Sequence, residues 1–104
     1  QSHTFQLDFD EQLNIVHFTP AFQKVCPELA IERAFSDLFK LVAPQLVLTP
    51  QILDMFNGQL VTLCPLNSPT FVFGGAFHKL AHGVCFIGYP QLTNMGQLAQ
   101  MKLC

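Results

Sequence analysis

The C-terminal half of the chain contains segments that are apolar at consecutive positions, which constrains the fold more than any other feature of the sequence. Phe71, Val72 and Phe73 follow one another, and the same holds for the run from Val84 to Ile87. Neighbouring residues of a strand point to opposite faces of a sheet, so a strand of this kind is apolar on both faces. A sheet built from such strands has to be covered on both sides.

The pattern of strand and breaker residues predicts an α+β, PAS-like fold with a five-stranded antiparallel sheet, short helices on one face and a C-terminal exit helix. Residues 5–9 alternate at period two, and residues 13–18, 59–64, 70–77 and 84–89 have strand composition. The last three of these segments form a meander. Helices are predicted over residues 20–25, 36–41, 49–58 and 92–104, two of them starting at a Thr-Pro dipeptide.

Composition limits the possible functions. The chain has 104 residues, of which 50% are hydrophobic and 12% charged, and its net charge is −2. This length suits one module, predicted as a domain over residues 1–91 followed by the start of an exit helix at 92–104. The charge argues against nucleic-acid binding. Glycine, proline and asparagine interrupt the charge-free window of residues 55–77, which argues against a membrane span.

The apolar excess, with eleven phenylalanines, predicts a homodimer held together by a sheet face. The second face could instead be covered by the N-terminal extension. The interface residues predicted from the aromatic and aliphatic strand positions are Phe5, Val16, Phe18, Phe71, Phe73, Phe77, Val84 and Phe86.

The sequence resembles the PAS-like domain associated with haem-NO-binding domains, as in soluble guanylate cyclases and bacterial histidine kinases. Where the family has Arg-Pro this chain has Ala43-Pro44, which favours a bacterial relative. The resemblance covers residues 5–90 and is carried, in order, by Phe5-x-Leu7-x-Phe9-Asp10-x-x-Leu13-x-Ile15, Val25-x-Pro27-x-Leu29, Asp37-x-Phe39-x-Leu41-Val42-x-Pro44 and Gly58-Gln59-Leu60.

The resemblance implies a non-catalytic dimerisation and signal-relay domain of a two-component sensor histidine kinase, or less favourably of a guanylate cyclase. Its partners would be a second copy, a haem-NO sensor, and the kinase or cyclase output domain. Two further hypotheses stay open. One is a PAS sensor that binds haem or a small ligand, and the other is a scaffold that binds an unrelated protein through its apolar face.

Other motifs give weaker signals. His78 and His82 have a spacing that could bind zinc on a helix, but both are predicted near a strand end and a turn, so no metal or other cofactor is expected. Cys26-Pro27 and Cys64-Pro65 could provide a haem thiolate, although a helix end and a turn explain both prolines. The four cysteines are expected to be reduced thiols, which favours the cytoplasm. The sequence has no Ser-His-Asp order with a nucleophile elbow, no glycine-rich phosphate loop and no close carboxylate pair in an apolar context, so the chain is not expected to be an enzyme.

Overall fold

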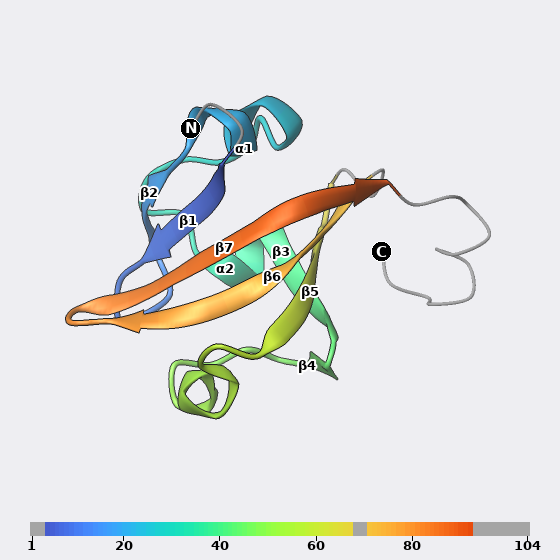
Figure 1. The fold of residues 1–104 in the computed structure, drawn as a ribbon. Coiled ribbons are helices and arrows are strands. Elements are labelled where there is room, and N and C mark those ends of the chain that lie inside the picture. Colours follow the sequence, from blue (N-terminus) through green and yellow to red (C-terminus); the bar gives the residue numbers. More distant parts are fainter. Residues whose placement is uncertain (1–3, 68–70, 93–104) are drawn as a thin grey trace.

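A computed structural model describes residues 4–67 and 71–92, which form one seven-stranded sheet with the strand order β2-β1-β7-β6-β5-β3-β4 (Figure 1). Every neighbouring pair of strands is antiparallel. The elements, in chain order, are β1 (Phe5–Phe9), β2 (Ile15–Phe18), α1 (Pro20–Val25), α2 (Phe35–Leu38), β3 (Phe39–Ala43), β4 (Gln45–Leu46), the 3-10 helix η1 (Ile52–Phe56), β5 (Leu60–Pro65), β6 (Phe71–Leu80) and β7 (Gly83–Leu92).

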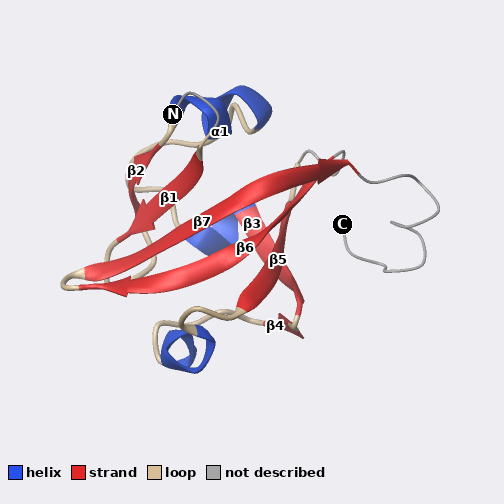
Figure 2. Cartoon of the chain, viewed as in Figure 1, coloured by secondary structure: helices blue, strands red, loops and turns tan. Residues whose placement is uncertain are grey.

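The predicted fold class is wrong. The described residues form seven strands and only two short α-helices, in place of a five-stranded sheet with helices packed on one face (Figure 2). The two strands that the sequence analysis missed are β3 and β4, which extend the sheet beyond β5. Strand β3 begins where residues 36–41 were expected to be helical, because the helix ends at Leu38 and Phe39 already has an extended backbone. Strand β4 follows it after Pro44.

The five strands that were expected from the sequence are present. Residues 5–9 and 15–18 form the N-terminal pair, and β5, β6 and β7 are consecutive neighbours, as predicted for a meander. Asp10 stabilises the turn between β1 and β2, because its Oδ1 accepts hydrogen bonds from the backbone N–H groups of Gln12 and Asn14, both at 2.9 Å. This is the role of a short acidic side chain in a turn.

The predicted helices agree with the structure to different degrees. Helix α1 covers the expected residues and has Pro20 in its first turn, but Thr19 does not cap it with its side chain. Instead, Thr19 Oγ1 accepts the backbone N–H of Gln6 at 3.2 Å and so joins α1 to β1. The helix expected over residues 49–58 is the shorter 3-10 helix η1. The exit helix expected over residues 92–104 lies outside the described residues, except that Leu92 ends β7.

The core lies on one face of the sheet, called here the inner face, and consists mainly of phenylalanine rings. Phe22 of α1 packs on Phe73 of β6 with ring centroids 4.5 Å apart, and Phe35 of α2 stacks on Phe39 at 5.8 Å. Phe77 and Phe86 meet at 5.4 Å on neighbouring strands. The helices thus contribute large apolar side chains that cover the inner face. Within the described ranges, no helix is long and apolar enough to span a membrane.

Candidate functional site

The predicted interface residues lie almost entirely on the inner face. Phe73, Phe77 and Phe86 have no exposed surface and Val84 is 2% exposed, since all four belong to the core. A side chain that is already covered within the protomer contributes no area to an interface. The partly buried members Phe5, Phe18 and Phe71 also pack against this core, and only Val16 is exposed.

The opposite face of β5, β6 and β7, called here the outer face, carries exposed apolar side chains. Leu60, Ala76 and Ile87 are aligned in register across the three strands. Leu60 is 80% exposed and Ile87 43%, and Tyr89 on the same strand is 50% exposed. The sequence indicates that this face is apolar. The predicted interface residues nevertheless occupy mainly the alternate positions of the strands, because the interface was predicted from aromatic side chains and most of these belong to the core.

Tyr89 lies over the backbone of the neighbouring strand. It is paired with Gly74, and a Cβ atom at Gly74 would be 3.0 Å from the Tyr89 ring. The missing side chain therefore leaves room for the Tyr89 ring beside Gly74. On the inner face, Gly75 and Gly88 are paired in the same way, and a Cβ at Gly75 would meet the backbone of β7. These glycines bring β6 and β7 close together beneath the apolar row.

A polar row crosses the outer face beside the apolar one. His78 is aligned with Cys85, Cys85 with Asp8, and Asp8 with His17. The Asp8 carboxylate accepts a hydrogen bond from Gln6 Nε2 at 2.9 Å and lies 3.6 Å from His17 Nδ1. Burial raises the pKa of the Cys85 thiol, and the Asp8 carboxylate raises it further. The row therefore holds an acidic group at β1 and an imidazole at β6, two strands apart.

The two histidines considered for zinc are not arranged as a site. His78 lies in β6, and His82 is an exposed residue of the turn between β6 and β7. Within residues 4–67 and 71–92, no group of three or more histidine, cysteine or acidic residues could hold a metal ion.

The two Cys-Pro dipeptides have different environments. Cys26 is buried at the end of α1, where burial and then the Glu28 carboxylate raise the pKa of its thiol to about 12. Haem ligation needs a thiolate, so this environment disfavours it. Cys64 is disulfide-bonded and lies with Val42 and Val72 in a small buried cluster. The expectation of reduced thiols is therefore met at Cys26 and Cys85 and is wrong at Cys64.

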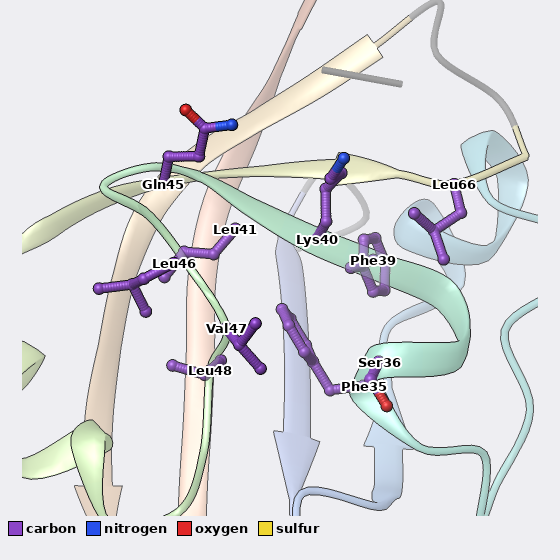
Figure 3. A pocket seen from close by; sticks show the side chains of 10 residues that line it. All are labelled: Phe35, Ser36, Phe39, Lys40, Leu41, Gln45, Leu46, Val47, Leu48 and Leu66. Atoms are coloured by element: carbon purple, nitrogen blue, oxygen red, sulfur yellow. The ribbon is translucent and has the colours of Figure 1, made fainter. Parts of the chain in front are cut away.

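A pocket of about 340 Å³ lies at the edge of the sheet that β4 forms, beside α2 and β3 (Figure 3). It forms where β4 ends, because β4 pairs only with Leu41 and Val42 of β3, and the chain then leaves the edge at Val47. Sequence reasoning missed this pocket, since it depends on the unpredicted hairpin of β3 and β4. Its lining residues are Phe35, Ser36, Phe39, Lys40, Leu41, Gln45, Leu46, Val47, Leu48 and Leu66.

Comparison with known proteins does not assign the chain to a family. No protein-family model matches it, and no curated protein matches it. The features that bear on function are therefore the outer face and the pocket.

Proposed function

We propose that this chain is a non-catalytic dimerisation and signal-relay domain that pairs with a second copy through its outer face. The observation that carries the proposal is the apolar row of Leu60, Ala76 and Ile87, flanked by the exposed ring of Tyr89. Exposed apolar side chains that are contiguous on one rigid sheet are typical of a protein-protein interface. A second copy would remove them from water.

The polar row supports a second copy as the partner. Strand β7 lies between β6 and β1, so a two-fold axis that runs along β7 between two facing sheets places β6 of one protomer over β1 of the other. His78 then faces the partner's Asp8, and Ile87 faces its own copy. On this axis Ile87 forms the central contact, Ala76 lies over Gln6 of the partner subunit, and an imidazole faces a carboxylate on each side.

The proposed relay works through the packing of the two sheets. A signal that favours one packing angle of the two sheets over another would shift the population of dimer conformations, and an output domain would sense the change. The resemblance of the sequence to haem-NO-associated domains supports a sensor histidine kinase of bacterial type as the parent protein. On the same ground, the proposed source of the signal is a haem-NO sensor.

Sedimentation equilibrium of wild type and Ile87→Lys over a wide concentration range tests the dimer. The substitution places a charge at the centre of the proposed interface, so we expect the dissociation constant to rise at least about tenfold, which corresponds to roughly 1.4 kcal/mol. Ile31→Lys is the matched control, because Ile31 is also half-exposed, at 53%, but lies in the loop after α1. A monomeric wild type, or equal weakening by both substitutions, would refute the proposal.

A further inference from the structure

We propose that two copies of the chain form a zinc site on each side of their two-fold axis, with Asp8 and His17 from one protomer and His78 from its partner. The site rests on the proposed outer-face dimer and adds a metal that regulates it. Within residues 4–67 and 71–92 of one protomer, no group of three or more histidine, cysteine or acidic residues could hold a metal ion. A second copy supplies the missing ligand.

The half-site in one protomer is the pair of Asp8 and His17, which are aligned on the neighbouring strands β1 and β2. Asp8 Oδ2 lies 3.6 Å from His17 Nδ1, which is too long for a hydrogen bond. Two ligand atoms that bind one tetrahedral zinc ion, each at about 2.1 Å, are about 3.4 Å apart. The two atoms therefore already have nearly the separation that a shared zinc ion requires.

The Asp8 carboxylate is oriented and available for a metal. Its other oxygen, Oδ1, accepts a hydrogen bond from Gln6 Nε2 at 2.9 Å, and such a bond orients a metal-binding carboxylate. No lysine or arginine of the described ranges forms an ion pair with Asp8. The side chain of His17 is 61% exposed and that of Asp8 22%, so a partner can reach both.

The third ligand comes from β6 of the second copy. His78 is aligned with Cys85, and Cys85 with Asp8, so the three residues lie at one level of the sheet. The two-fold axis along β7 places β6 over the partner's β1, and at this level His78 faces the partner's Asp8. Packed sheets lie about 10 Å apart. The exposed His78 side chain extends into this space, where it can meet a zinc ion held by the partner's Asp8 and the partner's His17.

The ligand set selects the metal. Two imidazoles and a carboxylate are ligands that zinc accepts, and three protein ligands leave the fourth position to water. Magnesium prefers oxygen ligands, so we do not expect it to bind here. Cys85 lies at the same level, but it is 5% exposed and is already covered within the protomer. A zinc ion bound by both protomers stabilises the dimer, because the complete site exists only in the associated state.

Sedimentation equilibrium of the 104-residue chain in zinc chloride, magnesium chloride or EDTA tests the site. We expect zinc to lower the dissociation constant of the dimer at least about tenfold relative to EDTA, and magnesium to leave it unchanged. Isothermal titration calorimetry should give one zinc ion per protomer. A dimer of equal strength in zinc and EDTA would overturn the zinc site and leave the proposed dimer standing. A monomer under all three conditions would overturn both.

Mixing two variants tests whether the site is shared between protomers. His78→Gln and His17→Gln each remove one ligand from both sites, so neither variant alone should dimerise more tightly in zinc than in EDTA. Their heterodimer has one complete site, because one protomer keeps Asp8 and His17 and the other keeps His78. The equimolar mixture should therefore regain part of the zinc effect.

His82→Gln is the matched control, because His82 is an exposed histidine of the turn after β6 and should keep the full zinc effect when replaced. Each variant is compared in zinc and in EDTA, so a weaker dimer alone does not imitate a lost metal site. The shared site would be overturned if the zinc effect survived in His78→Gln, or if the mixture responded to zinc no better than either variant.

Discussion

At the residue scale, the adjacent glycines Gly74 and Gly75 of β6 differ in what a side chain would contact. A Cβ at Gly75 would fall on the carbonyl oxygen of Ile87 and lie 2.6 Å from the Cα of Gly88, both of them backbone atoms. A Cβ at Gly74 would instead meet the Tyr89 ring, which is exposed and can turn away. The close approach of β6 and β7 therefore depends on Gly75 far more than on Gly74.

Gly75→Ala should accordingly destabilise the fold by about 3 kcal/mol, because two paired strands have to separate. Gly74→Ala is the control and should cost less than about 1 kcal/mol, since only a side chain has to move. Urea denaturation of both variants gives the comparison. Equal losses of stability would contradict the strand spacing described here.

The thiol of Cys26 makes the stability depend on pH on the alkaline side. Its pKa is raised from 9.0 to about 12 by burial and by Glu28. Above pH 9 the unfolded chain loses this proton and the folded chain keeps it, so the unfolded state is favoured as the pH rises. The stability contributed by the neutral thiol is complete below pH 9 and is lost between pH 9 and 12.

We therefore expect the wild type to lose about 1 kcal/mol more than Cys26→Ala between pH 8 and pH 10. Cys26→Ala is less stable at both values, since it leaves a cavity, but its loss with pH reflects only the other titrating groups. Chemical denaturation at the two pH values measures the difference. Parallel pH profiles of the two proteins would show that Cys26 titrates normally in the folded state.

At the scale of elements, η1 packs on the core through Leu53 and Phe56, and hydrogen bonds of the loop that follows it add a link to β6. Asn57 Oδ1 accepts the backbone N–H of Lys79 at 2.8 Å, and the backbone N–H of Gly58 donates to the carbonyl of Phe77 at 2.7 Å. An ion pair between Lys79 Nζ and Asp54 at 3.0 Å is exposed. Exposed ion pairs contribute little, whereas the backbone hydrogen bond fixes the position of the loop.

Asn57→Ala should thus cost about 1 kcal/mol and speed hydrogen exchange of the η1 amides. Asp54→Asn removes only the ion pair and should leave both quantities nearly unchanged. Hydrogen-deuterium exchange followed by mass spectrometry separates η1 from the strands. Faster exchange in Asp54→Asn than in Asn57→Ala would contradict this ranking.

The elements also show what the sequence could and could not predict. Long alternating or breaker-bounded segments, such as residues 5–9 and the meander, were predicted correctly because strand period and turn chemistry agree there. Residues 36–41 were not, because Leu38 and Leu41 have the spacing of a helical face while Phe39 and Leu41 have the spacing of one strand face. So short a run does not distinguish the two periods. The pocket depends on this hairpin and was missed with it.

For the whole molecule, the decisive question is which sheet face meets a partner. The sequence shows that both faces of β6 and β7 are apolar, but not which face the helices cover. Helices α1 and α2 contribute Phe22 and Phe35 to the inner face, whereas Leu60, Ile87 and Tyr89 of the outer face stay exposed. The position of the helices decides which alternate residues of β6 and β7 face the core. The residues that remain for an interface are known only once that position is known.

A charge exchange tests the two-fold arrangement directly. In the proposed dimer His78 faces the partner's Asp8 twice, so Asp8→Lys replaces the acceptor in both contacts and His78→Asp places two carboxylates together. Each variant alone should dimerise about tenfold more weakly than the wild type. In an equimolar mixture, the heterodimer restores one original contact and pairs the introduced cation with the introduced carboxylate.

Sedimentation equilibrium should therefore show more dimer in the mixture than in either variant at the same total concentration. Within one protomer the two positions lie two strands apart, on β6 and β1, so a direct intramolecular contact does not explain such a recovery. Mixing Asp8→Lys with wild type is the control, because it restores one contact without forming the exchanged one. If the mixture of the two variants associates no better than its components, the two-fold axis does not run along β7.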